Sequence, residues 1–144
     1  MGEKPQEGSV TFYVDASIPI AVRRALAEVR DDVRFAGGPE APKENTQDRH
    51  WLRIAGENDW VVLKRDKKIR TRPGERAALI EAGVRTFCLT GGGNYNRWQT
   101  LELLVQRWRR IEEVAETVAG PYIYAVTWSG VKQLPLAGVA QRPG

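Results

Sequence analysis

The sequence predicts an α/β fold in which one parallel, twisted sheet of about five strands carries helices on both faces. Three observations predict it. Short apolar runs rich in β-branched and aromatic residues, typical of strands buried on both faces, alternate with longer segments of helical periodicity. Clusters of glycine and proline separate the two kinds of segment. Because such strands are joined by right-handed helical crossovers, they form a single parallel sheet.

Five short runs are the expected strands. They cover Val10–Val14, Val33–Ala36, Trp60–Lys64, Val84–Thr90 and Tyr122–Trp128. The chain has 144 residues, about the size of one domain, and shows no internal repeat or dividing linker. We therefore expect a leader over residues 1–9, one domain over 10–136 and a loose tail over 137–144.

Four segments have helical periodicity. Ser17 is expected to cap the first, whose inward stripe is Ile18, Val22, Leu26 and Val29. The second begins near Thr46, and the third runs from Pro73 to a stop at Gly83. The longest helix has an apolar stripe that we expect to face the core, made of Trp98, Leu101, Leu104, Val105, Trp108, Ile111, Ala115 and Val118.

Composition excludes several classes of protein. Hydrophobic residues make up 42% of the chain and charged residues 28%, which suits a soluble globular domain. No apolar run approaches the roughly 20 residues that span a bilayer, and the polar N-terminus does not resemble a signal peptide. A single cysteine, Cys88, excludes a disulfide framework, and together with a single histidine, His50, it argues against a zinc site. The expected location is the cytoplasm, with no membrane partner.

Positive charge is concentrated in one segment, Lys64–Arg72, which reads KRDKKIRTR. It carries six basic residues and one acid, a charge of +5, whereas the whole chain carries +4, so the remainder is about −1. A basic patch of this kind attracts polyanions, most commonly nucleic acid. Its candidate phosphate-binding residues are Lys64, Arg65, Lys67, Lys68, Arg70 and Arg72.

Three acids follow strands in the predicted sheet. Asp15 directly follows the first strand, Asp66 follows the third, and Asp48 lies in the first turn of the helix entered after the second. Sites in open parallel sheets lie at the carboxyl ends of the strands, so we expect these carboxylates to converge. Three other acids precede strands and belong at the opposite edge: Asp31, Asp32 and Asp59.

Converging carboxylates repel one another unless a cation lies between them, and their oxygens select hard cations such as Mg²⁺ or Mn²⁺. Such a site can activate water for attack on phosphorus. Each acid has a structural alternative. Asp15 could cap a helix or make an Asx-turn, Asp48 could favour the helix dipole, and Asp66 could balance the charge of its basic segment.

The loop GGGNYN lies between the fourth strand and the longest helix. Backbone N–H groups of such a loop can bind phosphate, but it lacks the Lys-Ser/Thr of a P-loop. Asn94, Tyr95 and Arg97 are candidates to contact metal-bound water or RNA at this edge. An ordinary connecting loop is the alternative.

Two segments, YVDAS and TQDRHWLRIAGENDWVVLKRDKKI, resemble the PIN-like nucleases, and most closely the short VapC-type toxins of bacterial toxin–antitoxin pairs. The resemblance implies a three-layer PIN-like fold and a Mg²⁺- or Mn²⁺-dependent endoribonuclease. It also implies a cognate antitoxin and often a homodimer. Its catalytic, metal-binding acids would be Asp15, Asp48 and Asp66.

The sequence departs from the family pattern at two places. Arg65 precedes the third acid, where Thr or Ser is commoner, and the loop Gly91–Asn94 offers no fourth acid. Asn94 could hold a metal-bound water, or a second metal site could be weakened. Two functions of different classes therefore stay open: a ribonuclease toxin, and a catalytically weak PIN-like module that binds RNA or protein.

Overall fold

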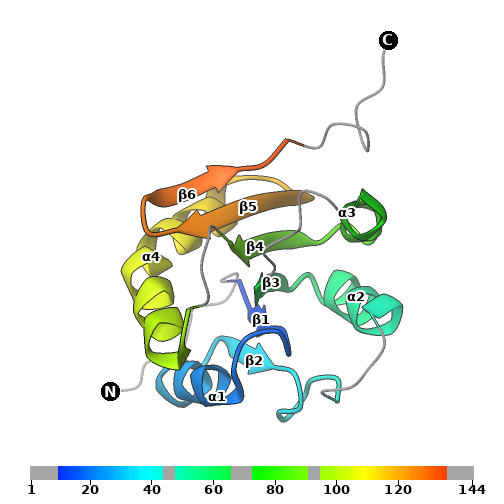
Figure 1. Cartoon of the computed structure of the whole chain (residues 1–144). Coiled ribbons are helices and arrows are strands. Elements are labelled where there is room, and N and C mark those ends of the chain that lie inside the picture. Colours follow the sequence, from blue (N-terminus) through cyan, green and yellow to red (C-terminus); the bar gives the residue numbers. More distant parts are fainter. Residues whose placement is uncertain (1–9, 44–47, 66–72, 91–94, 136–144) are drawn as a thin grey trace.

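The computed structural model describes residues 10–43, 48–65, 73–90 and 95–135. Its strands form one sheet in the order β2-β1-β3-β4-β5-β6 (Figure 1). Strands β1 to β5 pair in parallel, and β6 pairs antiparallel with β5. The bounds are β1 Phe12–Val14, β2 Val33–Phe35, β3 Val61–Arg65, β4 Arg85–Leu89, β5 Tyr122–Thr127 and β6 Gly130–Gln133. The predicted α/β class with a largely parallel sheet is confirmed.

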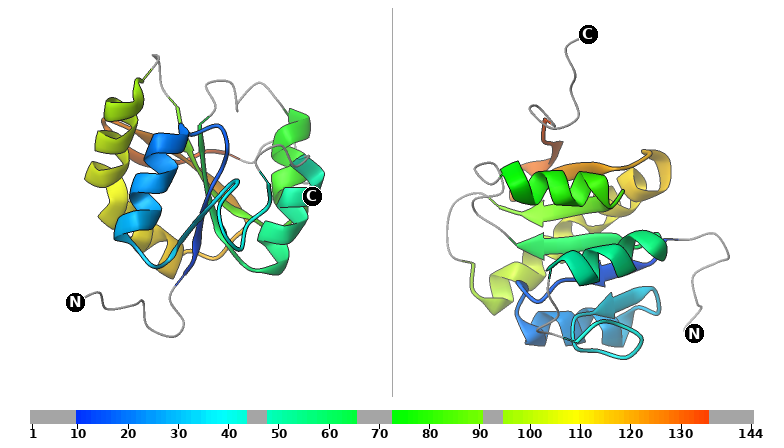
Figure 2. Two further views of the ribbon diagram at one scale, coloured as in Figure 1. Left: turned by 90° about the horizontal axis from the view of Figure 1, so that it is seen from below. Right: turned by 90° about the vertical axis from the view of Figure 1, so that its right-hand side faces the viewer.

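Helices cover both faces of this sheet. They are α1 (Ile20–Val29), α2 (Asp48–Glu57), α3 (Pro73–Glu81) and α4 (Arg97–Thr117). Figure 2 shows α1 and α4 on one face and α2 and α3 on the other. The chain therefore folds into three layers. Within the described residues, no helix is long and apolar enough to cross a membrane.

Side chains of each strand alternate between two apolar cores. Phe12 and Val14 of β1 pack toward α1 and α4, and the Phe12 ring lies 4.8 Å from that of Trp108. Tyr13 packs on the other side, where its ring stacks on Trp60 at 5.3 Å. Burial on both faces explains why the strands are continuous apolar runs rather than alternating ones.

A sixth strand, β6, was not predicted. The sequence interpretation ended regular structure after the fifth strand, whereas a tight turn returns the chain so that Val131 pairs with Val126. Strand β6 is polar and lies at the edge of the sheet, with Lys132 and Gln133 exposed. An edge strand with charged side chains gives no apolar pattern, so periodicity did not reveal it.

Three details of the predicted helices are wrong. Helix α1 begins at Ile20 after Pro19, with no side-chain cap, so Ser17 is not its capping residue. Val29 is 77% exposed, and on α4 Trp98 and Val105 are 65% and 61% exposed. The buried face of α4 is centred near Leu104, and at about 100° per residue Val105 lies about 100° and Trp98 about 120° away from it.

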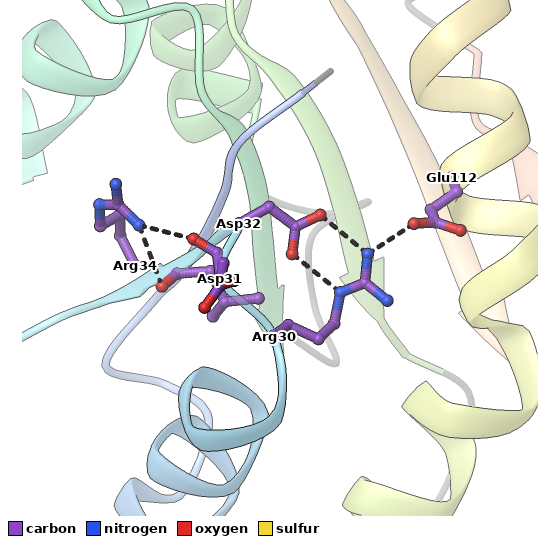
Figure 3. Close-up of polar contacts among 6 residues, drawn as sticks. Arg30, Asp31, Asp32, Arg34 and Glu112 are labelled. Atoms are coloured by element: carbon purple, nitrogen blue, oxygen red, sulfur yellow. Dashed lines mark hydrogen bonds and ion pairs between the residues drawn. The ribbon is translucent and has the colours of Figure 1, made fainter. Parts of the chain in front are cut away.

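A network of charged side chains joins α1, β2 and α4 at the amino edge of the sheet (Figure 3). The Arg30 guanidinium donates to both carboxylate oxygens of Asp32 at 2.8 Å and to Glu112 at 2.7 Å. It also lies 5.0 Å from the centre of the Trp108 ring. Asp32, which precedes β2, thus lies at the edge opposite the carboxyl ends of the strands, as predicted, and its carboxylate is paired with Arg30.

Candidate active site

Asp15 lies where β1 ends. Its backbone N–H donates to the Leu63 carbonyl of β3 at 2.9 Å, so the chain leaves β1 directly beside the end of β3. The half-buried carboxylate accepts through Oδ2 from the Ser17 N–H at 3.0 Å and from the Ser17 hydroxyl. Asp15 therefore makes the Asx-turn that was one alternative. Among the described residues, the hydrogen bonds that its carboxylate accepts go to Oδ2.

Ser17 connects this carboxylate to β3. Its hydroxyl oxygen donates to Asp15 Oδ2 and accepts from the Arg65 backbone N–H at 3.0 Å. This bridge joins residues 48 positions apart in the chain. Sequence reasoning assigned Ser17 to the helix cap and missed the bridge. The signal was the Asp-x-Ser spacing, in which a hydroxyl two residues after an acid can close a turn on it.

Arg23 donates hydrogen bonds to the segment that links β1 to α1. Its side chain is only 2% exposed although it lies on α1. Nε donates to the Ile18 carbonyl at 2.6 Å, Nη1 to Ala36 at 2.7 Å, and Nη2 to Ala16 at 3.5 Å. The guanidinium thus fastens the segment after β1 to the end of β2. No sequence signal indicated this role, because an arginine on an amphipathic helix is ordinarily solvent-exposed.

Asp48 is the first residue of α2. The short turn Asn58–Trp60 joins α2 to the start of β3, so α2 ends at the amino edge and begins toward the carboxyl edge. The backbone of Asp48 therefore lies on the expected side. The Asp48 side chain and several other predicted site residues lie outside the described part of the chain, namely Asp66, Lys67, Lys68, Arg70 and Asn94.

Other acids are placed as predicted. Asp59 lies at the amino edge, with its Oδ1 3.4 Å from Arg85 Nη2 at the start of β4. Within the described residues, no three Asp, Glu, His or Cys side chains come together as a metal site. The Asp15 carboxylate, at the carboxyl edge, is an oxygen ligand of the type that Mg²⁺ and Mn²⁺ prefer.

Arg65 ends β3, and its side chain lies over one aromatic ring, that of Tyr95. Its guanidinium carbon lies 5.7 Å from the centre of the Tyr95 ring. The Tyr95 ring meets Trp128 edge-on at 6.0 Å. Arg97 is the first residue of α4 and is exposed at the same edge. Lys64, by contrast, is only 6% exposed, so this cation of the basic segment belongs to the protein interior.

The charges of Asp15 and Arg23 affect the pKa of a buried tyrosine next to them, Tyr13. Burial raises the pKa of the Tyr13 hydroxyl above its ordinary value of 10.0, and the negative charge of Asp15 raises it further. The positive charge of Arg23 acts in the opposite direction. Tyr13 therefore stays a neutral phenol beside the carboxylate.

Comparison with known proteins identifies the family. The sequence profile described as the PIN like domain matches residues 10–91, more than half of the chain. The match runs from β1 through β4 and includes Asp15, Asp48 and Asp66. No curated protein and no solved structure matches the chain significantly. The chain belongs to the family of PIN-like domains.

Proposed function

We propose that this protein is a metal-dependent endoribonuclease whose catalytic site lies at the carboxyl edge of the sheet. PIN domains are typically nucleases and generally use divalent metals. The observation that carries the proposal is the Asp15 carboxylate, held by Ser17 beside the end of β3. That edge is also the one toward which α2 begins with Asp48, and Asp66 follows β3 directly in the chain.

The ligands that we assign to the metal are Asp15, Asp48 and Asp66. When bound, Mg²⁺ or Mn²⁺ would supply an activated water and charge stabilisation at the scissile phosphate. Ser17 orients Asp15, and Arg23 keeps the segment that carries both residues in place. We assign RNA binding to Asn94 and to the basic residues Arg65, Lys67, Lys68, Arg70 and Arg97.

The toxin role is the finer part of the proposal. It rests on the resemblance of the YVDAS and TQDRHW segments to VapC-type toxins. The partners are then RNA, a cognate antitoxin that blocks the site, and a second copy of the chain. A small DNA-binding protein encoded next to this one, co-purifying with it and stopping its cleavage of RNA, is the expected observation.

A second function has its own support. Arg65 replaces the commoner Thr or Ser, and its guanidinium lies over the Tyr95 ring at 5.7 Å. An arginine and aromatic rings at this edge serve RNA binding whether or not cleavage follows. A PIN-like module that binds RNA or protein with weak catalysis is therefore the alternative.

Cleavage of a structured RNA separates the two. We expect cleavage with Mg²⁺ or Mn²⁺ and none in EDTA. Asp15→Asn should lose more than the roughly 10- to 100-fold that typically follows loss of an outer-shell partner of a metal site. Asp59→Asn is the matched control, because Asp59 is 87% exposed at the opposite edge. Asparagine also tolerates its positive φ of 57°.

Three results would change the conclusion. Cleavage that persists in EDTA rules out the metal mechanism. Equal damage from Asp59→Asn and Asp15→Asn means that the site is not at the carboxyl edge. RNA binding without cleavage under any divalent metal supports the alternative function.

A further inference from the structure

Three side chains from different strand ends meet at the carboxyl edge of the sheet. Arg65 ends β3, Tyr95 lies between β4 and α4, and Trp128 follows β5 in the turn to β6. Strands β3, β4 and β5 are parallel neighbours, so their carboxyl ends lie side by side. We call Arg65, Tyr95 and Trp128 the aromatic platform.

The platform is a continuous set of contacts. The Arg65 guanidinium lies over the Tyr95 ring at 5.7 Å, and the Tyr95 ring is perpendicular to that of Trp128 at 6.0 Å, with an interplanar angle of 82°. The Tyr95 hydroxyl donates to the Thr90 carbonyl at 3.2 Å, which fixes the ring at the end of β4.

Hydrogen bonds from α4 hold the backbone at Trp128, while the Trp128 side chain is exposed to solvent. Arg107 of α4 donates through Nε to the Thr127 carbonyl at 3.1 Å and through Nη2 to the Trp128 carbonyl. The Trp128 side chain nevertheless stays 40% exposed. Its backbone is therefore positioned in advance, and the ordering cost of a bound partner is small.

We propose that the aromatic platform stacks an unpaired base of single-stranded RNA. The exposed Trp128 indole offers a π-face, and the guanidinium over the neighbouring Tyr95 ring offers a positive charge, which suit a base and its phosphate. Bases of single-stranded segments can splay onto such faces, whereas bases within a duplex are already stacked. Stacking tolerates any base, so the platform selects single-stranded RNA and not a particular sequence.

The platform is connected to the candidate active site, and this inference rests on the proposed function. The Arg65 N–H donates to the Ser17 hydroxyl, which in turn donates to Asp15. Two hydrogen bonds thus separate the platform backbone from the carboxylate. A base stacked here places a neighbouring phosphate of the same strand near Asp15.

The test measures binding in EDTA, where the proposed cleavage is silent. A labelled single-stranded RNA and the same sequence in a duplex are titrated by fluorescence anisotropy. Trp128→Ala should raise the Kd for the single strand by at least about fivefold, as loss of one stacked base does. The Kd for the duplex should change little. Trp128→Phe keeps a π-face and should recover most of the affinity, whereas Trp128→Leu keeps only apolar volume and should not.

Salt dependence distinguishes stacking from charge. Trp128→Ala should leave the slope of log Kd against log salt unchanged, whereas Arg65→Gln should lower it by about 0.7 for the lost phosphate contact. Trp98→Ala is the matched control. Trp98 is 65% exposed and, within the described residues, makes no ring contact, so we expect less than about a twofold change in Kd.

Several outcomes would overturn the inference. They are an unchanged Kd in Trp128→Ala, equal weakening of single strand and duplex, or a loss in Trp98→Ala as large as in Trp128→Ala. A Trp128→Ala protein that binds RNA normally but no longer binds its antitoxin assigns the platform to a protein partner instead. If a thermal melt shows that Trp128→Ala is unfolded, the Kd values of Trp128→Phe and Trp128→Leu decide whether the platform binds RNA by stacking. Metal-dependent cleavage is assayed separately, so the proposed function can stand or fall without the platform.

Discussion

Ser17 illustrates how much one hydroxyl group can do at the end of a strand. It donates to the carboxylate of its own turn and accepts from the backbone of a distant strand. The bond to Asp15 limits the orientations of its carboxylate. The bond from the Arg65 N–H fixes the start of the basic segment relative to that carboxylate. In metal sites, loss of a partner that orients a ligand typically costs about 10- to 100-fold in metal affinity or activity.

Ser17→Ala should therefore lower metal-dependent cleavage by about 10- to 100-fold. The residue is exposed, so the free energy of unfolding should fall by only about 1 kcal/mol or less. Ser17→Thr keeps the hydroxyl and should retain most of the activity. Thr117→Ala is the control, because it removes a hydroxyl that donates to the backbone carbonyl of Glu113 at 2.7 Å near the opposite edge. Wild-type cleavage by Ser17→Ala would show that the bridge does not orient Asp15.

At the scale of elements, the C-terminal end of α2 approaches the end of α3 closely. Gly56 of α2 faces the end of α3 closely, and a Cβ there would lie 2.5 Å from the Ala82 carbonyl oxygen. Gly74, in the first turn of α3, has nothing within 4 Å of such a Cβ. Both glycines are helical, so they form a matched pair.

The two substitutions to alanine should have opposite effects. Gly74→Ala should raise the free energy of unfolding by up to about 1 kcal/mol through helix propensity. Gly56→Ala gains the same propensity but must displace backbone, and should be destabilised by about 1–3 kcal/mol. Urea denaturation measures both. Stabilisation by both substitutions would mean that α2 and α3 separate without cost.

At the scale of the whole molecule, folding stability depends on pH through a tyrosine buried in the parallel sheet, Tyr122. Burial raises the pKa of Tyr122 from 10.0 to about 12, with the positive charge of Arg85 acting against the shift and Tyr124 adding to it. A pKa raised in the folded state means that unfolding releases a proton more readily. The corresponding stability is complete below pH 10.0 and is lost as the pH rises toward about 12.

Tyr122→Phe should flatten this alkaline loss. Among the described residues its buried hydroxyl has no hydrogen-bond partner, and its ring packs on Tyr124 at 5.0 Å, so phenylalanine keeps the contacts that matter. The decrease in unfolding free energy between pH 8 and 11 should shrink by about 1.4 kcal/mol, and the Tm at pH 7 should rise slightly. Urea titrations at each pH test this. A decrease as steep as that of wild type would mean that Tyr122 already ionises in the folded state.

Much of the architecture follows from sequence order alone. Strands buried on both faces must be continuous apolar runs, and parallel strands place every segment that follows a strand at one edge. This is why the sequence alone predicts Asp15 at the carboxyl edge, and Asp32 and Asp59 at the other. The edge at which each acid lies follows from chain direction alone, which the sequence states directly.

Tertiary structure decided what depends on contacts between distant segments. The burial of Arg23, the bridge from Ser17 to Arg65 and the exposure of Trp98 have no local pattern, because each depends on which neighbour occupies the adjacent space. The polar edge strand β6 likewise exists only because β5 offers an open row of backbone groups. The meeting of Arg65 with Tyr95 and Trp128 came from strand order, which brings β3, β4 and β5 side by side although nothing in their sequences records it.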